Sequence, residues 1–544
     1  MQGENARCDI LLRGGIVYDG TGAPGGCADI AITDERIVAI GELDNWQAGM
    51  VVNVEGLCVA PAFIDIHTHS DFSLLHHPEQ LSMVYQGIGT QVMGNCGLGV
   101  AQTDASPRFQ QEQRWLKPYG VEVDWNRFEE HLKRVEDQGV GTNIIFLCAH
   151  GTLRKKVMHF DQRAPTAEEL AAMQREVAVC MEAGAWGFST GLEYVPGCYA
   201  DTQELIELAK VAAEYGGFYA THLRSEGDQL IESVAEAIQI AEQAELSLQL
   251  SHHKAEGHRN WGKVHQTLQM VSDAIQRGLD VMLDVYPYTA YQTSMAVACL
   301  PSWVLSGEPK EVVERLRDPD IRLRILQEMR ERHDDWETAI IGSVPGNRAL
   351  QGLSVAQAAA EAGQSPEEFV LDLLLQEGLF VSVACFNLSE EDLRTVLRYP
   401  LTMIGSDGVG YDPAKMNAER PHPRCYGTFP RVLRHYVREE SLLTLEEAIF
   451  KMTGLPAARL RLTDRGILQP GAYADIVVFD YARITDRATF REPHQLAEGV
   501  VHLLLNGRWV LRDGHHTGAR AGKVLRKDKQ TKPTNSHITS LGSE

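Results

Sequence analysis

The chain has 544 residues, more than a single domain usually holds, so we expect one large main domain with an accessory domain. Apolar residues make up 44% of the sequence and charged residues 23%, ordinary globular usage that excludes a fibrous or largely disordered protein. A formal charge of −23 repels polyanions, so we expect neither nucleic acid nor a membrane surface as a partner.

The N-terminal sequence and the cysteine content predict a cytoplasmic protein. MQGENARCD is polar and acidic where a signal peptide needs an apolar core, and no later stretch approaches the roughly 20 apolar residues of a membrane span. The ten cysteines include no CxxC pair and lack the dense spacing of a secreted scaffold. We expect reduced, mostly buried thiols, with Cys96 as the exception argued below.

Both ends of the chain have the pattern of a small β-domain, with short strands punctuated by glycine. The strands are DILLRGGIVYDG, ADIAITDERIVAIG and MVVNVEGLCVA near the start, and ADIVVFD and VHLLLNGRWVLRDG near the end. We interpret residues 1–61 and 459–524 as one composite β-sandwich. Residues 525–544 form a polar, Lys-rich tail with few apolar residues, which is predicted to be disordered.

The middle of the chain, residues 62–458, alternates short apolar strands with helices. From Thr166 to Tyr288 a helix-then-strand unit recurs about every 30 residues, the length of βαβ units in a parallel sheet. Thr166 and Glu169 form a capping-box pattern before one of these helices, and Gly184 ends it. The eight predicted strands are AFIDIH, TQVMGNC, TNIIFLCAH, AWGFST, GFYATH, LSLQLSH, LDVMLDVY and LTMIGSD.

Eight strands that alternate with helices predict an α/β fold of the (β/α)8 TIM-barrel type. Residues 290–347 lie between the seventh and eighth of these strands. Because this stretch is too long for a simple loop, we expect it to form a lid or subdomain.

Ligand-type residues occupy the ends of five predicted strands, where a (β/α)8 barrel carries its functional side chains. The first strand ends in HxH, whose histidines point to one face because residues two apart on an extended chain project the same way. Each residue alone has an ordinary explanation, such as a surface histidine, a buried thiol or a turn aspartate. Five strand ends together favour a metal site instead. The predicted ligands are His67, His69, Cys96, His222, His252 and Asp407.

The mixture of imidazole, thiolate and carboxylate favours zinc over magnesium or calcium, which prefer oxygen ligands. Six ligands exceed the three protein ligands of a usual catalytic zinc site. We therefore expect two metal positions.

Five segments, together with LQPGAYADIVVFD near the end, resemble the D-aminoacylase branch of the amidohydrolase superfamily over about residues 8–515; they are APAFIDIHTHSD, GNCG, THLRSE, SHHK and GSDG. The resemblance implies one tight zinc held by Cys96, His222 and His252, and a weaker second position formed by the other three ligands. It also supports the composite β-sandwich and the lid.

The same resemblance implies zinc-dependent hydrolysis of N-acyl-D-amino acids to a carboxylate and a free D-amino acid. Zinc lowers the pKa of its bound water to about 7, so hydroxide is available at neutral pH to attack the amide carbonyl. Asp407 is expected to pass the proton of that water to the leaving nitrogen. Its alternative role is that of a ligand alone. The D configuration is taken from the family, because residue spacing carries no information on it.

Two alternative functions stay open. One is the opening of a cyclic amide or hydantoin, but hydrolases of that kind usually carry a carboxylated lysine at the end of the fourth strand, and GFSTGLEY has none. The other is a catalytically inactive scaffold that resembles amidohydrolases. Such proteins typically lose ligands, whereas all six positions are filled here.

A free amino-acid product implies a substrate carboxylate, which needs fixed cations in an acidic protein. Lys254 in SHHK and Arg424 in HPR match carboxylate-binding positions of the family, with a solvated surface charge as the alternative for each. By the same resemblance, Tyr194 and Tyr286 are expected to line the pocket, unless they are packed in the core.

Four positions depart from the family pattern or stay undecided. Ala62 stands where the family usually has glycine before the first strand, and we expect only a small structural change. Tyr291 and Gln292 replace the small polar residues that tend to follow VYPYTA, which leaves the side-chain preference open. His150 in AHGTLR is either a pocket residue or a turn histidine, and we leave it out of the metal set.

Overall fold

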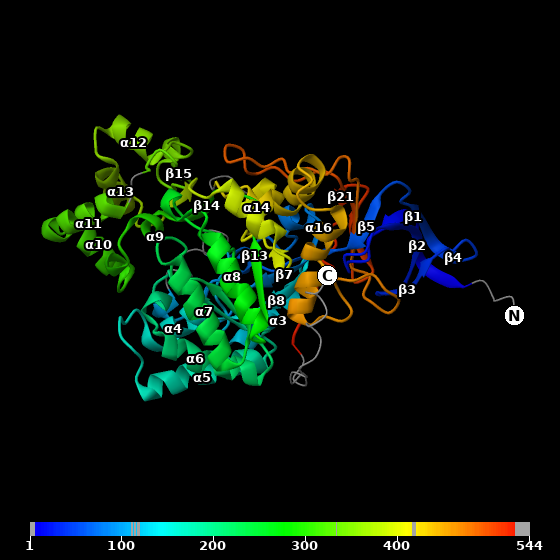
Figure 1. Cartoon of the computed structure of the whole chain (residues 1–544), viewed down its shortest axis with the longest axis horizontal. Coiled ribbons are helices and arrows are strands. Elements are labelled where there is room, and N and C mark those ends of the chain that lie inside the picture. The colour runs from blue at the N-terminus through cyan, green and yellow to red at the C-terminus, as the bar shows by residue number, and fades with distance from the viewer. Residues whose placement is uncertain are drawn as a thin grey trace.

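A ring of parallel strands forms the centre of the computed structural model. Figure 1 shows some of these strands in the middle of the molecule, with helices around them. The structure describes residues 6–109, 113, 116, 120–332, 335–415 and 420–527. The predicted (β/α)8 barrel is confirmed, with eight strand positions in the predicted order. They are β6 (Phe63–Asp65), β7 (Ile88–Met93), β8 (Asn143–Phe146) continued by β9 (Cys148–Ala149), β10 (Phe188–Gly191), β11 (Phe218–His222), β12 (Ser247–Leu250), β13 (Val281–Val285) and β17 (Thr402–Ile404).

Parallel pairing runs through β6, β7 and β8 and again from β9 through β10, β11, β12 and β13 to β17. The first and last strands meet just beyond their ends. There the amide of Asp407 donates to the carbonyl of His67 at 2.8 Å, and the amide of His69 donates to the carbonyl of Gly408 at 2.7 Å. These two bonds bring the ligand-bearing ends of the first and eighth strands side by side.

Helices surround the barrel strands, and they begin where the sequence signals place them. The capping box of Thr166 and Glu169 starts α5 (Ala167–Glu182), and Gly184 follows it in the left-handed region at φ 107°. Asp201 caps α6 (Thr202–Glu214) by accepting a bond from the amide of Glu204. The other helices around the barrel are α1 (Leu81–Val84), α3 (Phe128–Gln138), α4 (His150–Met158), α7 (Leu230–Ala244), α8 (Lys263–Gln276), α14 (Glu390–Arg398), α15 (Arg424–Arg431), α16 (Leu445–Met452) and α17 (Gly454–Leu460).

The barrel strands are buried on both faces, as expected for a parallel sheet covered by helices. One set of side chains packs inside the ring, where Ile64, Val92 and Ile145 meet Met282 and Met403. The opposite faces pack against the helices in a larger core. These two layers make the barrel a rigid support for the residues at its strand ends.

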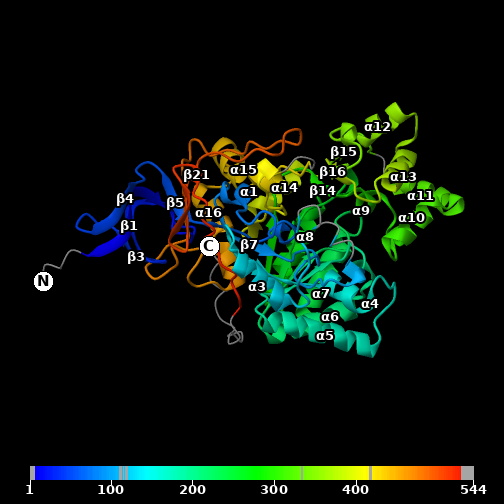
Figure 2. The same ribbon diagram turned by 180° about the vertical axis from the view of Figure 1, so that it is seen from behind.

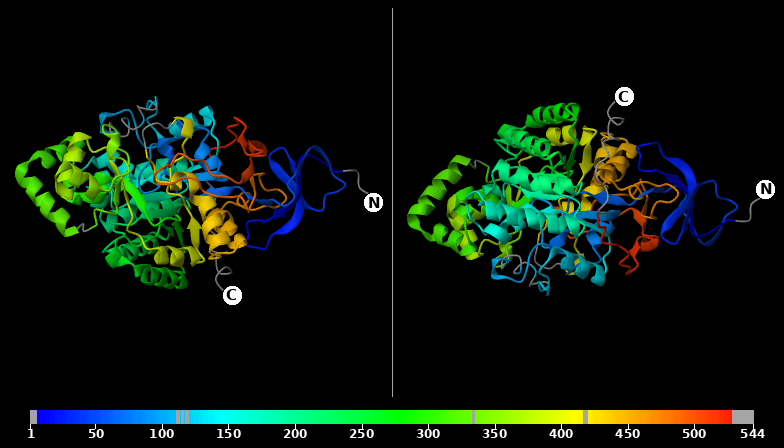
Figure 3. Two further views of the ribbon diagram at one scale, coloured as in Figure 1. Left: turned by 90° about the horizontal axis from the view of Figure 1, so that it is seen from above. Right: turned by 90° about the horizontal axis from the view of Figure 1, so that it is seen from below.

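The insertion between β13 and β17 is longer than predicted. It starts as expected with β14 (Tyr291–Ser294), but it ends with β16 (Ser382–Cys385) and not at Asn347, because β16 pairs with β14 and with β15 (Ala339–Ile341). The insertion has its own hydrophobic core. Its helices are α9 (Met295–Cys299), α10 (Pro309–Arg317), α11 (Pro319–Arg332), α12 (Val355–Ala362) and α13 (Pro366–Gln376). Figure 3 shows it at the opposite end of the molecule from the N-terminal strands.

The two ends of the chain meet in one nine-stranded sheet beside the barrel (Figure 2). The junction is β5, which pairs in parallel with β1 and antiparallel with β18. Pairing along the sheet is continuous, so it is one folded sheet and not two separate ones. Its strands are β1 (Arg7–Val17), β2 (Gly26–Thr33), β3 (Arg36–Gly41), β4 (Gln47–Asn53), β5 (Cys58–Pro61), β18 (Ile476–Phe479), β19 (Val500–Leu505), β20 (Arg508–Arg512) and β21 (His515–His516).

The C-terminal segment returns to the barrel, which differs from the prediction that residues up to 524 belong to the sandwich. The amide of Ile144 donates to the carbonyl of Lys523, and the amide of Leu525 donates to the carbonyl of Ile144, both at 2.8 Å. The indole of Trp186 donates to the carbonyl of Leu525 at 2.7 Å. Residues 525–527, predicted as the start of the tail, are therefore bound to the barrel. The rest of the predicted tail, residues 528–544, lies outside the described residues.

Within the described part of the chain, no helix is both long and apolar enough to cross a membrane.

Candidate metal centre

The six predicted ligands lie together at the C-terminal ends of the barrel strands, although they come from segments up to about 340 residues apart. Each lies at the end of its strand or within four residues beyond it. Their possible ligand atoms form two groups, in each of which all atoms lie within 4.8 Å of one another. The first group is Cys96, His222 and His252, and the second is His67, His69, Cys96 and Asp407. Cys96 belongs to both.

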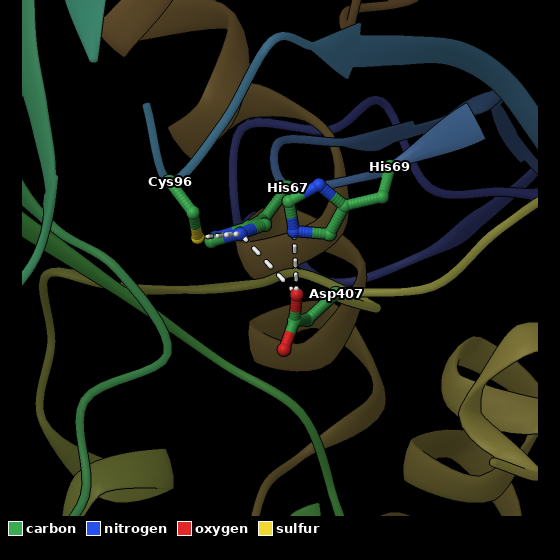
Figure 4. A group of neighbouring side chains, drawn as sticks. All are labelled: His67, His69, Cys96 and Asp407. Carbon is green, nitrogen blue, oxygen red and sulfur yellow. Dashed lines mark hydrogen bonds and ion pairs between the residues drawn. The ribbon is translucent and has the colours of Figure 1, made fainter. Parts of the chain in front are cut away.

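Cys96 connects the two groups directly. Its Sγ lies 3.5 Å from Nε2 of His252 and 3.3 Å from Nε2 of His67. In the first group, Nδ1 of His222 lies 2.9 Å from Nε2 of His252. In the second, Oδ1 of Asp407 lies 3.4 Å from Nε2 of His67 and 3.1 Å from Nε2 of His69. Figure 4 shows these four side chains of the second group pointing toward one another.

These separations fit shared coordination of zinc. Zinc bonds of about 2.0–2.3 Å in a tetrahedral arrangement place neighbouring donor atoms roughly 3.3–3.6 Å apart. The two sulfur-to-nitrogen distances and the 3.4 Å oxygen-to-nitrogen distance fall within this range, and the 3.1 Å distance lies just below it. The 2.9 Å separation between the nitrogens of His222 and His252 is shorter than the range. The donor set of one thiolate, imidazoles and one carboxylate is also of the kind that zinc prefers.

Three of the predicted ligands have backbone conformations that residues with a side chain rarely adopt. Cys96, His252 and Asp407 have φ values of 54°, 33° and 49°. A non-glycine residue in this region costs on the order of 1–3 kcal/mol, and such residues cluster at functional sites. At each of these positions the chain turns sharply just after a strand, which directs the side chain over the mouth of the barrel.

Three carboxylates fix the orientation of three histidines. Oδ1 of Asp284 lies 3.0 Å from Nδ1 of His67, and Oε1 of Glu226 lies 2.9 Å from Nδ1 of His252. In both cases the carboxylate accepts from Nδ1, which leaves Nε2 to face Cys96. Such carboxylate partners are typical of histidines that bind metal.

His222 has the opposite arrangement. Oε2 of Glu193 lies 2.9 Å from Nε2 of His222, so Nδ1 is the nitrogen left for a metal. That Nδ1 also lies 3.4 Å from the hydroxyl of Tyr194. Each of these three histidines therefore has one nitrogen held by a carboxylate and the other directed into the centre.

The electrostatics hold the acidic ligands in their anionic forms. Burial raises the pKa of the Cys96 thiol, but the charge of His67 and hydrogen bonds from His222 and His252 outweigh it, and the pKa lies well below its usual value. Burial also raises the pKa of Asp407, but Arg424 and His69 lower it well below its usual range. Thiolate and carboxylate are the forms that bind zinc.

The four predicted substrate-binding residues lie around the same centre. Nη1 of Arg424 lies 2.8 Å from Oδ2 of Asp407, and Nζ of Lys254 lies 2.6 Å from Oε2 of Glu226. The ring of Tyr286 lies between the two cations, 4.9 Å from the guanidinium of Arg424 and 5.6 Å from the ammonium of Lys254. Both cations are held inside the site and are not solvated surface charges.

Other residues from the sequence analysis have structural partners. Nε2 of the buried His150 lies 2.9 Å from Oε1 of Glu204, away from the metal ligands. Tyr291 donates a hydrogen bond to Glu256. Gln292 donates to Oγ of Ser382 at 2.9 Å, which ties β14 to β16 of the insertion.

Sequence reasoning did not identify the three carboxylates as part of the site. Glu226 and Glu193 were present in the quoted segments THLRSE and GLEY, and Asp284 interrupts the apolar strand LDVMLDVY. A charged residue inside an otherwise apolar strand was the signal that could have revealed Asp284, because a buried carboxylate needs a partner.

Comparisons with known proteins agree over almost the whole chain. Residues 50–511 match the model of the amidohydrolase family. A D-aminoacylase of Alcaligenes xylosoxydans xylosoxydans is 37% identical over 525 residues, which are 96% of this chain and 99% of that protein. An N-acyl-D-aspartate deacylase of the same organism is also 37% identical, over 96% of this chain and 95% of that protein.

Solved structures give the same result. A D-aminoacylase whose binuclear metal centre was studied superposes with a TM-score of 0.80 at 36% identity, over 96% of this chain and 100% of that one. An N-acyl-D-glutamate deacylase from Bordetella bronchiseptica, in complex with zinc and a phosphonate mimic of the tetrahedral intermediate, has a TM-score of 0.80 at 34% identity and the same coverage.

Proposed function

Because this chain belongs to the amidohydrolase family, we propose that it is a zinc-dependent enzyme that hydrolyses N-acyl-D-amino acids to a carboxylate and a free D-amino acid. The observation that carries the proposal is the convergence of six ligand-type side chains from five strand ends. Relatives that match 96% of this chain act on this substrate class, as their names state.

We assign the tight zinc to Cys96, His222 and His252, supported by the buried thiolate and the two oriented imidazoles. His67, His69 and Asp407 form the weaker second position, with Cys96 between the two. Bound zinc activates water for attack and polarises the amide carbonyl.

Asp407 moves the proton in this proposal. Its carboxylate is buried, and Oδ1 faces the histidines while Oδ2 faces Arg424. Because Arg424 keeps it ionised, Asp407 is ready to accept the proton that the attacking water loses. It then donates this proton to the amide nitrogen as the C–N bond breaks, since expulsion of an unprotonated amine is very slow.

Lys254, Arg424 and Tyr286 are the proposed anchors of the substrate carboxylate. The two cations flank one tyrosine, whose buried hydroxyl has no hydrogen-bond partner among the described residues. A carboxylate placed there would accept charge-assisted hydrogen bonds and would supply a partner for Tyr286. Tyr194, beside His222, lines the other side of the centre.

We also propose a cytoplasmic location. The centre depends on the free thiol of Cys96, and a reducing compartment keeps thiols available as ligands. Fractionation of the native cells tests this, and recovery of the protein in an oxidising compartment would contradict it.

The proposed function is tested with a panel of N-acetyl-D and N-acetyl-L amino acids, assayed with zinc and after treatment with a chelator. We expect release of the free amino acid from D substrates, loss of at least 90% of the activity after chelation, and recovery with zinc. Cyclic amides and hydantoins form the comparison set. No turnover of either enantiomer in the presence of zinc, or faster turnover of cyclic amides, would overturn the proposal.

A further inference from the structure

We propose that this enzyme acts on N-acyl derivatives of basic D-amino acids, whose cationic side chain lies in an acidic cavity beside the metal centre. This inference rests on the proposed function and names the substrate class of the same site. It is carried by the residues that line the cavity and by the negative charges that have no cationic partner there.

The cavity, here called the acidic cavity, has a volume of about 680 Å³ and opens on the metal centre, where Asp407 lines it. Its wall contains five further carboxylates from separate parts of the chain. Four of them follow β10, β11 and β12, and the fifth belongs to the insertion. They are Glu193, Glu226, Asp228, Glu256 and Asp335. A wall of this composition attracts a positively charged group.

The acidic cavity contains the residues that the proposed function assigns to both ends of the amino-acid part of the substrate. His222 and His252, ligands of the tight zinc at which the amide is attacked, line it. So do Lys254 and Tyr286, two of the three carboxylate anchors. None of these four residues lines the neighbouring cavity of about 650 Å³, whereas Arg424 lines both. Because the Cα atom joins the amide nitrogen to the carboxylate, it lies between the two pairs, and the side chain starts in the acidic cavity.

Two polar groups in the wall of the acidic cavity lack a hydrogen-bond partner. Tyr286 is only 2% exposed, and its hydroxyl has no partner among the described residues. The buried Oδ1 of Asn387, in the same wall, has none among them either. The phenol can donate to a substrate carboxylate, whereas the amide oxygen can only accept and therefore suits a donor such as a guanidinium or ammonium group. The cavity thus offers a partner for each end of a basic amino acid.

The wall of the acidic cavity also contains arginines, but these have partners already. Nε of Arg224 lies 2.9 Å from Oε2 of Glu236. Nη2 of Arg259 lies 2.6 Å from Oδ2 of Asp228. Lys254 is held by its own ion pair and is assigned to the substrate carboxylate. An acidic side chain would have to break one of these pairs to bind in the cavity, and it would leave a carboxylate of the protein without its cation.

Three carboxylates of the wall form no ion pair with Lys or Arg among the described residues: Glu193, Glu256 and Asp335. The partners of Glu193 and Asp335 are histidine rings, at 2.9 Å and 3.7 Å. Glu256 accepts a hydrogen bond from Tyr291, one of the positions at which the sequence departs from the family pattern. Burial and the charge of Glu193 raise the pKa of Glu256 to about 7, as expected where carboxylates face one another without a cation. A cationic substrate side chain supplies that missing charge.

The first test compares N-acetyl-D-arginine with N-acetyl-D-citrulline, a neutral analogue of nearly the same shape, on the wild-type zinc enzyme. We expect kcat/KM to be at least about five-fold higher for the arginine derivative, because charge-assisted hydrogen bonds are stronger than neutral ones. N-acetyl-D-glutamate should be the poorest of the three, since its side chain faces carboxylates. The assays contain about 0.15 M salt, at which the Debye length of about 8 Å screens long-range attraction by the net charge of −23.

The second test removes charge from the wall. Glu256→Gln can still accept the hydrogen bond from Tyr291, and we expect it to lower the arginine-to-citrulline ratio at least about three-fold. Asp335→Asn, in the insertion, should lower the ratio in the same direction. Glu232→Gln is the matched control, because Glu232 is exposed on α7 and lies outside the cavity wall, and it should change the ratio less than about 1.5-fold. Thermal melts and zinc contents establish that each variant is folded.

The outcomes separate this inference from the proposed function. A smaller preference for N-acetyl-D-arginine over N-acetyl-D-citrulline than expected, or faster cleavage of N-acetyl-D-glutamate than of N-acetyl-D-arginine, overturns the inference and leaves the deacylase activity intact. An arginine-to-citrulline ratio that neither folded wall variant lowers also overturns it, and the wild-type series decides if neither variant folds. Absence of turnover with every N-acyl-D-amino acid overturns the proposed function itself.

Discussion

Single residues at this site combine strained backbone with tightly constrained side chains. Cys96, His252 and Asp407 have positive φ angles, and the nearby histidines each have one nitrogen held by a carboxylate. The six residues of the proposed metal site could be predicted from the sequence, because they stand at the ends of predicted strands. The sequence could not predict the positive φ angles or the histidine tautomers, because both depend on side chains that come from other strands.

Asp407→Asn separates the proton-transfer role of Asp407 from its role as a ligand. The variant keeps the shape of the side chain but cannot accept a proton, so we expect a folded protein that retains its tight zinc and loses at least about 100-fold in kcat. Turnover of N-acetyl-D-leucine and zinc content are measured together. Asp412→Asn, in the loop that follows, is the matched control. Normal turnover in Asp407→Asn would rule out the proton-transfer role.

At the scale of the elements, alternation and capping signals identified all eight barrel strands and helices such as α5. The end of the insertion was less predictable, because β16 is a short apolar strand whose partners, β14 and β15, are defined by long-range pairing. The role of Asp284 in β13 was also hard to predict, because it depends on long-range contacts. Asp284 faces inward and contacts His67 beside the first strand and Gln249 of β12.

Asp284→Asn tests the positioning role of that strand residue. Asp284 accepts from the ring of His67 and from the backbone amide of His252 at 2.8 Å. We expect the weaker metal position to lose about 10- to 100-fold in zinc affinity, measured by competition with a chelator, while excess zinc restores activity. Asp280→Asn, which removes a carboxylate paired with Arg459 at the start of the same strand, should leave the affinity unchanged. Unchanged affinity in Asp284→Asn would contradict the role.

For the whole molecule, composition and strand patterns predicted that the two chain ends form β-structure beside a barrel, and the nine-stranded sheet joins them through β5 and β18. The return of the C-terminal segment to the barrel was not predicted. Lys523 and Leu525 lie in a polar stretch that resembles a disordered tail. Their hydrogen bonds to Ile144 are made by backbone atoms, so the residue types do not indicate them. The barrel, by contrast, places the six proposed ligands from distant segments at one end.

The zinc content of Cys96→Ala tests most directly whether these segments meet around one metal centre. The account predicts that the purified wild-type protein holds at least one equivalent of zinc and that Cys96→Ala holds less than roughly a tenth of an equivalent, with turnover lost, because thiolate is the softest of the ligands. Cys180→Ala, at a buried cysteine of α5, should keep both zinc and turnover. A full equivalent of zinc and normal turnover in Cys96→Ala would contradict the account.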